Sequence, residues 1–368
     1  MLGLKFEKES SPWWVRSAIP FFAIAVTFVF TALFLFIARV DPIAAFYAML
    51  IEPLTASVSA LEVLVKMTPL LLTGVAVVFA FRSGYYNIGA EGQLYAGALV
   101  AAWVGQLPMA STAPPIVMIP LMILGGMIGG TIWALAPALL RTRFEVDEVV
   151  TTLLLNTVML YLVSAVLNGP WLDPVTHWPQ SPRIAPNAEF PIIIPGSRVH
   201  FGLIVGLVIM IGMWFVVRRT PLGLRLRAVG LNKDAARFMG INVGRHILIA
   251  ALVSGAIAGV AGASEVAGIH HRLLEDISAN YGYSGIVIAT LGELNPFGAG
   301  LAAFFIALIQ VGGQSVSREL GIPTFLADIV QATLLLTMLA MLLLTQYRLR
   351  FTRRRKPAVV TTAPPPSA

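Results

Sequence analysis

Several side chains that form hydrogen bonds or carry charge lie within the most apolar parts of this chain. The densest group is in the segment Tyr85-Tyr-Asn-Ile-Gly-Ala-Glu-Gly-Gln-Leu-Tyr95, whose glycines permit bends and close helix approach. Polar groups are costly to bury, so they indicate either function or hydrogen bonds between helices. We interpret five residues as candidates for the lining of a solute path: Tyr85, Asn87, Glu91, Gln93 and Asn156. Two alternatives stay open: Glu91 could be solvated at the lipid headgroups, and Asn156 could tie two helices together.

Other polar residues in apolar runs are better explained as ties between helices, namely Glu265, Gln310, Asp328 and Gln331. Glu62 and Lys66 are four residues apart, a spacing that predicts an ion pair along one helix. Glycine pairs four residues apart indicate tight helix packing: Gly125/Gly129, Gly126/Gly130, Gly202/Gly206 and Gly255/Gly259.

A second candidate for function is the basic segment 218–245, which contains a short predicted helix. Asn232 can cap the start of this helix and Gly240 can supply a left-handed stop. A helix of two turns is marginal in water, so it needs a surface to pack on. That surface is either the protein's own inner face or a cytoplasmic partner, and the spacing leaves both open.

Enzyme chemistry finds little support in the sequence. There is no cysteine, and the five histidines include no His-Glu-x-x-His pair that could bind zinc. No Gly-x-x-x-x-Gly-Lys-Ser/Thr motif occurs, so nothing suggests that the chain hydrolyses ATP by a P-loop of its own. Gly282-Tyr-Ser-Gly285 matches the nucleophile motif of rhomboid proteases, but no histidine follows residue 271 to activate Ser284. We therefore expect no catalytic residues, no metal site and no cofactor.

The composition indicates an integral membrane protein. Of 368 residues, 57% are hydrophobic and only 12% are charged, against about 25% charged in soluble domains. The mean hydropathy is +0.83. The net charge of +7 could suggest a nucleic-acid partner, but in membrane proteins excess Lys and Arg gather on the cytoplasmic face. We therefore expect a lipid bilayer and no nucleic acid as the surroundings.

Long apolar runs predict an all-α polytopic fold with about ten transmembrane helices, one or two of them short or broken. The runs are 18–38, 61–81, 93–110, 116–140, 148–168, 199–217, 246–268, 282–292, 297–316 and 322–345. The run 282–292 is too brief for a straight crossing and precedes the turn signal Glu293-Leu-Asn-Pro296. It is predicted to be a broken or re-entrant helix.

The distribution of basic residues predicts that both termini lie in the cytoplasm. With ten crossings, all but six of the 25 Lys and Arg residues lie inside, the exceptions being Arg39, Lys66, Arg183, Arg198, Arg272 and Arg318. The domains are then a cytoplasmic segment 1–16, a transmembrane domain 17–347 and a basic, disordered cytoplasmic tail 348–368. The outer loop 169–198 carries seven prolines, so we expect it to be stiff, either as a lid or docking rim or as a connector.

At these segments the chain resembles the permease subunits of ABC importers for nucleosides and simple sugars, over about residues 60–345. Asn87-Ile-Gly-Ala-Glu-Gly-Gln93 is similar to the signature of the nucleoside-type branch, and Tyr281-Gly-Tyr-Ser-Gly285 to a late region of the family. Gly223-Leu-Arg-Leu-Arg-Ala-Val-Gly230 and 235–241 resemble the family's coupling loop. That loop commonly reads Gly-Glu-Asn-Pro, where this chain has Gly230-Leu-Asn-Lys233.

The resemblance implies a type II importer-like fold and a permease that works with other subunits. These are a second permease, homologous or identical, a cytoplasmic ATP-binding subunit that hydrolyses the ATP, and an extracytoplasmic substrate-binding protein. The residues implied in coupling to the ATPase are Gly223, Arg225, Arg227, Gly230, Asp234, Ala235, Ala236 and Gly240. The location implied is the inner (plasma) membrane of a bacterium.

The resemblance favours a nucleoside, above all a purine nucleoside, as the solute, with a simple sugar as runner-up. Amides and aromatic rings such as Asn87, Gln93 and Tyr86 suit a neutral, hydrogen-bonding solute. The competing hypothesis is a self-sufficient secondary transporter or channel that uses broken helices and buried carboxylates such as Glu91 and Asp328.

Overall fold

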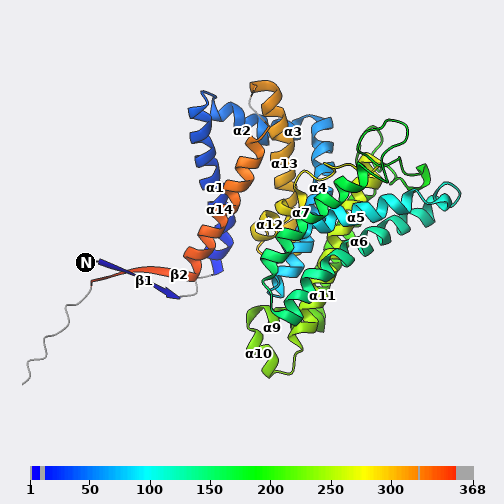
Figure 1. The fold of residues 1–368 in the computed structure, drawn as a ribbon. Coiled ribbons are helices and arrows are strands. Elements are labelled where there is room, and N and C mark those ends of the chain that lie inside the picture. Colours follow the sequence, from blue (N-terminus) through cyan, green and yellow to red (C-terminus); the bar gives the residue numbers. More distant parts are fainter. Residues whose placement is uncertain (1, 9–12, 322–323, 354–368) are drawn as a thin grey trace, which may run out of the picture.

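The computed structural model describes residues 2–8, 13–321 and 324–353 and is dominated by helices (Figure 1). Long apolar runs become helices because a helix satisfies every backbone hydrogen bond within itself, as a lipid environment requires. Within these residues, seven helices are long and apolar enough to cross a membrane. They are α1 (Trp13–Ile37), α4 (Ser57–Arg82), α6 (Pro115–Phe144), α7 (Glu148–Leu167), α8 (Gly202–Arg219), α11 (Val243–Glu265, continued by the π-helical turn η3, Val266–His270) and α13 (Pro296–Leu320).

The other three predicted runs are also helical: α5 (Ala90–Gly105), α12 (Tyr281–Leu291) and α14 (Leu326–Gln346). Every one of the ten predicted runs therefore has a matching helix, and the all-helical polytopic fold class is confirmed. With 11 residues, α12 is about 16 Å long, roughly half of a hydrocarbon core about 30 Å thick.

The chain between α11 and α13 runs through the bundle with a single short helix. Near its start, the carbonyl oxygen of Leu273 accepts a hydrogen bond from the backbone N–H of Ser181 in the long loop (3.0 Å). After α12, the ring of Phe297 packs on Trp214, close to the other end of α8, with ring centroids 5.4 Å apart. The segment 271–296 thus passes from one end of the bundle toward the other, and α12 is its only helical part.

The two ends of the bundle differ. At one end lie α9 (Pro221–Leu231) and α10 (Lys233–Phe238), and we name it the α9–α10 end (Figure 1). At the opposite end, the loop end, residues 168–201 connect α7 to α8 and include the short helix η2 (Pro186–Ala188). The start of α1 and the end of α14 both point toward the α9–α10 end (Figure 1), which is the arrangement that an even number of crossings requires.

Two short helices that the sequence analysis did not predict lie at the loop end, α2 (Pro42–Leu50) and α3 (Glu52–Thr55). The carboxylate of Asp41 caps α2 by accepting the N–H of Ile43 (2.9 Å). Another short helix, η1 (Pro108–Ser111), lies between α5 and α6.

The termini contain two antiparallel strands, β1 (Leu2–Lys8) and β2 (Tyr347–Arg353). The prediction of a disordered tail from residue 348 is therefore wrong for 348–353. The sequence there alternates apolar Leu349 and Phe351 with arginines, a strand pattern that the basic composition of the tail obscured. The rest of the predicted tail, 354–368, lies outside the described residues, as do residues 1 and 9–12 of the predicted N-terminal segment.

Glycines allow α5, α6 and α11 to pack closely in the centre of the bundle. A Cβ atom on Gly130 would overlap the carbonyl oxygen of Gly255, and one on Gly97 would overlap the backbone of Gly259. Gly126 also faces Gly259 across the same contact. The predicted packing role of the pairs Gly126/Gly130 and Gly255/Gly259 is confirmed, and this contact fixes the frame that holds the polar residues.

Candidate functional site

Asn87 is fully buried in the turn between α4 and α5. Its Oδ1 accepts hydrogen bonds from the N–H of Gly89 (2.9 Å) and from Nε2 of Gln93 (3.2 Å). Its Nδ2 donates to Oε1 of Gln93 (2.9 Å) and to Oγ of Ser254 on α11 (2.9 Å). The amide therefore uses its full hydrogen-bonding capacity, and it joins the start of α5 to α11.

Asn156 on α7 is also fully buried and joins three elements. Its Oδ1 accepts the N–H of Gly92 on α5 (2.9 Å). Its Nδ2 donates to the carbonyl oxygen of Ile88 (2.9 Å) and to the hydroxyl of Tyr283 on α12 (3.1 Å). A side chain at position 92 would collide with Asn156, so glycine is needed there for α5 and α7 to approach.

Glu91 is 2% exposed and lies against the N-terminus of α12. Its Oε2 accepts the backbone N–H of Gly282 at 2.6 Å. Free N–H groups and the helix dipole make a helix N-terminus a favourable place for a carboxylate. The alternative of a solvated Glu91 at the lipid headgroups is therefore wrong in this structure.

We name Asn87, Glu91, Gln93, Asn156 and Ser254 the polar hub. All five are at most 2% exposed. Their hydrogen bonds tie α5 to α7, α11 and α12, and none of the five borders the apolar groove that lies between α6, α8 and α11. In this conformation the hub acts as a tie between helices, and its role in a solute path stays a prediction.

Tyr85 differs from the other predicted path residues because it faces the α9–α10 end. Its ring belongs to a buried apolar cluster that includes Val229 of α9, Ala236 of α10 and Ile247 of α11. Its hydroxyl is buried, and the described part of the chain offers it no hydrogen-bond partner. The residue thus connects the segment that contains the hub with the elements predicted to couple.

The short helix predicted in segment 218–245 is present as α10, and a second helix, α9, precedes it. Asn232 caps α10 by accepting the N–H groups of Asp234 and Ala235, both at 2.9 Å. Gly240 follows with the positive φ of +78° that a left-handed stop requires. Both signals were correctly interpreted from the sequence.

The predicted coupling residues divide into a buried and an exposed group. Gly223 is buried against the backbone of α8, and Ala236 is 1% exposed. The exposed residues are Arg225, Arg227, Gly230, Asp234, Ala235 and Gly240. Among them, Gly230 lies against the backbone of Arg82 and Gly84 at the end of α4. Contacts with the protein's own bundle therefore hold α10 in place, and the exposed group is what a partner can reach.

Large apolar side chains are also exposed on α9 and α10. Phe238 is 95% exposed, and the others are Leu224, Leu231 and Met239. Such a patch marks an interaction site when it lies in water. None of these four residues was predicted from the sequence, although Leu224 and Leu231 could have been found by their spacing from the buried Leu226 and Val229.

The predicted ion pair between Glu62 and Lys66 is wrong. Glu62 pairs with Arg198 of the long loop (2.6 Å), and Lys66 donates to the hydroxyl of Tyr281 (2.9 Å). Both partners are more than a hundred residues away in the chain. Partners brought close by the fold therefore replace the local i, i+4 pair.

Of the other polar residues in apolar runs, Glu265 and Gln331 are buried. Gln331 on α14 accepts a hydrogen bond from Ser284 on α12 (2.8 Å), as expected of a tie between helices. Glu265 lies 3.6 Å from Nε2 of His270. Asp328 is exposed, so it does not supply the buried carboxylate that the hypothesis of a secondary transporter invoked.

The proline-rich loop is fastened to the loop end by side-chain hydrogen bonds. Trp171 Nε1 donates to Gln106 Oε1 (2.7 Å), and Gln106 Nε2 donates to Ser181 Oγ (3.1 Å). The N–H of Val175, then the hydroxyl of Thr176, hold the pKa of Asp173 below its ordinary value. These contacts agree with the predicted stiffness, and whether the loop is a lid, a rim or a connector stays open.

The described residues include no group of three or more His, Asp or Glu side chains that could hold a metal ion.

Comparison with known proteins identifies the family. Residues 59–341 match the family described as branched-chain amino acid transport system / permease component. The glucose ABC transporter permease protein TsgB13 of Haloferax volcanii is 34% identical, over 94% of each chain. The guanosine ABC transporter permease protein NupP of Bacillus subtilis is 34% identical over 75% of this chain and 79% of its own. The nucleoside ABC transporter permease protein NupB of Lactococcus lactis is 29% identical over 86% of this chain and 89% of its own. No solved structure matches the chain.

The chain belongs to this permease family. The resemblance inferred from 87–93 and 223–241 is thereby confirmed. The protein is a multi-pass permease subunit of an importer, and a self-sufficient secondary transporter is not favoured.

Proposed function

We propose that this permease carries a nucleoside, above all a purine nucleoside, through the membrane, driven by a separate ATPase that binds at α9 and α10. The observation that carries the coupling proposal is the exposed apolar patch on α9 and α10, formed by Leu224, Leu231, Phe238 and Met239 beside Arg225 and Arg227. These helices also pack on the end of α4 and on Tyr85. A force applied to them therefore reaches the segment that contains the polar hub.

The solute proposal rests on the relatives named for guanosine and nucleosides and on the segment Asn87–Gln93. The hub offers amides without net charge apart from Glu91, which suits a neutral solute with many hydrogen-bonding groups. Because the hub amides are satisfied by one another here, contact with solute requires a second conformation in which α5 and α12 separate.

A simple sugar is the second candidate, because the Haloferax relative named for glucose matches 94% of the chain. A sugar is also neutral and rich in hydroxyl groups, so the same amides would suit it. The substrate-binding protein that delivers the solute is expected to supply most of the selectivity.

Competition for uptake in cells that express the complete transporter distinguishes the two candidates. We expect unlabelled guanosine, adenosine and uridine to inhibit the uptake of labelled guanosine strongly, and glucose and ribose not to inhibit it. Strong inhibition by a sugar with none by any nucleoside would contradict the nucleoside proposal and leave the permease assignment intact.

The remaining partners and the orientation complete the proposal. A second permease subunit, identical or homologous, would pair with this chain, and an extracytoplasmic substrate-binding protein would dock at the loop end. The α9–α10 end would face the cytoplasm of the cell and the chain would lie in its plasma membrane, in agreement with the charge distribution.

A further inference from the structure

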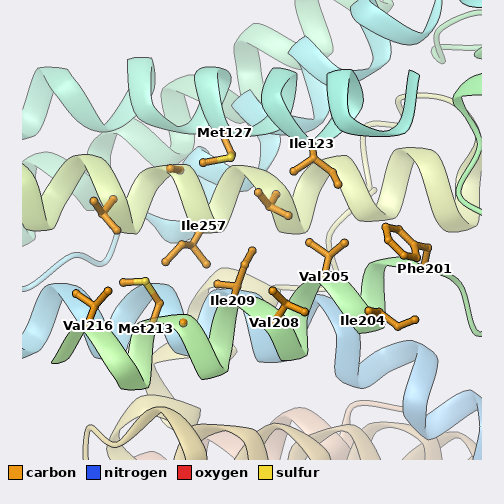
Figure 2. A pocket seen from close by; sticks show the side chains of 14 residues that line it. Ile123, Met127, Phe201, Ile204, Val205, Val208, Ile209, Met213, Val216 and Ile257 are labelled. Atoms are coloured by element: carbon orange, nitrogen blue, oxygen red, sulfur yellow. The ribbon is translucent and has the colours of Figure 1, made fainter. Parts of the chain in front are cut away.

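A groove of about 620 Å³ runs along the outside of the bundle between α6, α8 and α11. All 14 residues that line it are apolar (Figure 2). Gly212 contributes to the opening, because a Cβ atom at that position would meet no other atom within 4 Å. The groove therefore suits an apolar guest in the membrane.

The inner end of the groove is closed by a small apolar cluster. Met213, Val216 and Val253 line the groove and also pack against Phe79 of α4 and Leu226 of α9. This end of the groove is the one nearer to α9 and α10.

Three arginines follow residues of that cluster closely in the chain. Arg82 follows Phe79 by three residues, Arg218 follows Val216 by two, and Arg227 follows Leu226 directly. The guanidinium groups of Arg218 and Arg227 lie close enough to Arg82 to repel it. Within the described part of the chain, none of the three forms an ion pair with a carboxylate. An anion at this place would offset their mutual repulsion.

We propose that the groove and the three arginines form a binding site for an anionic phospholipid, with an acyl chain in the groove and the phosphate beside Arg218. From Phe201 to Val216 the groove extends about 22 Å along α8, longer than one leaflet of about 15 Å. With a volume of about 620 Å³ and a lining of apolar side chains alone, the groove suits a chain of methylene groups.

Lipid retention tests the site. The full-length chain, with whatever subunits co-purify, is incubated with equal amounts of phosphatidylglycerol and phosphatidylethanolamine of the same acyl chains, and the bound lipids are measured by mass spectrometry. We expect phosphatidylglycerol to be retained in excess. Arg218→Gln should weaken its retention about fivefold, and Gly212→Trp, which fills the groove, should lower the retention of both lipids.

Two control variants match these changes. Arg39→Gln removes a charge at the loop end, and Ile211→Trp adds the same bulk on the exposed surface of α8 outside the groove; neither should alter retention. Equal retention of the two lipids by the unmodified chain, or unchanged retention by Gly212→Trp, would overturn the proposal. A photo-crosslinking residue in place of Val208, which lines the groove, should capture lipid, and capture of a second protein chain would equally overturn it.

Discussion

At Gly282 the backbone of α12 lies directly against the backbone of α5. A Cβ atom there would overlap the backbone nitrogen of Glu91, and two helix backbones cannot easily retreat. We expect Gly282→Ala to destabilise the protein by about 2 kcal/mol or more, measured as a lower Tm in detergent. Gly212→Ala is the matched control, because its Cβ meets open space and alanine favours helix. Equal Tm values for the two variants would show that α12 does not rest on α5 in this way.

Asn156 supports the hub through three hydrogen bonds, and its removal leaves the N–H of Gly92 and the hydroxyl of Tyr283 without this partner. We expect Asn156→Ala to cost about 1–3 kcal/mol of stability, again measured as Tm. Asn168→Ala is the control. Asn168 is exposed, so water can replace its hydrogen bonds to Ser164 and Glu275. The hub would not hold the bundle together if Asn156→Ala unfolded no earlier than the control.

At the scale of residues, the sequence drew attention to the polar side chains of the hub, except Ser254, but not to how they pair. Asn87 and Ser254 are 167 positions apart, and no local pattern connects them. The same limit explains the error at Glu62 and Lys66, where a local rule competed with partners from elsewhere in the fold. Tyr85 was assigned to the path by its neighbours in sequence, whereas the positive φ of Gly84 turns the chain there toward α9.

Among the elements, α10 offers a test of the proposed ATPase contact. Ala235 is exposed and Ala236 is buried against the bundle, although the two are adjacent. We expect Ala235→Glu to keep the Tm of the permease but to abolish co-purification with the ATPase and solute uptake. Ala236→Glu should lower the Tm, because it buries a charge against Tyr85 and Val229. Undiminished co-purification and uptake with Ala235→Glu would place the ATPase contact elsewhere.

The protein should lose stability in acid because of His200, which lies in the loop 168–201 between α7 and α8. Burial, and to a lesser degree the charge of His271, lowers the pKa of His200 from 6.5 to about 4. The unfolded chain takes up a proton near pH 6.5 while the folded chain stays neutral, so folding stability falls as the pH drops from about 6.5 to about 4. We expect Tm to fall over this window, and His200→Gln to fall less.

His177 in the same loop is exposed and gives the control. Its replacement by Gln should leave the fall of Tm with acid as it is in the unmodified protein. An identical acid response of His200→Gln and the unmodified protein would argue against a buried neutral His200.

The sequence predicted elements well wherever an apolar run was long. A run of about 20 apolar residues has few alternatives to a helix in lipid, so all ten runs were found. The helices α2 and α3 were missed because Pro42–Thr55 is too short to cross a membrane and contains Glu52 and Pro53. Only the capping signals of Asn232 and Gly240 revealed the short α10.

The orientation of the whole molecule can be tested directly, because the chain contains no cysteine. Phe238 on α10 and Val175 in the long loop are 95% and 85% exposed, at opposite ends of the bundle. With a membrane-impermeant thiol reagent on intact cells, Val175→Cys should react and Phe238→Cys should react only after the cells are opened. The opposite pattern would reverse the orientation.

At this scale the charge distribution and the number of runs predicted which segments share an end of the bundle, since each crossing reverses the chain. A broken or re-entrant helix at 282–292 could be suspected from the length of the run, but the path of 271–296 could not be predicted, because contacts with Ser181 and Trp214 determine it. The close packing of α5, α6 and α11 gives this frame its rigidity, and α9 and α10 are attached at its end.

We propose that this permease moves its solute only when an ATPase acts on α9 and α10. Uptake of labelled guanosine into proteoliposomes that contain the complete transporter, with ATP enclosed on the side of the α9–α10 end and the substrate-binding protein outside, tests it most directly. We expect uptake that requires ATP and disappears when the catalytic lysine of the ATPase P-loop is replaced. Uptake by the permease alone, driven by a proton or sodium gradient, would contradict it.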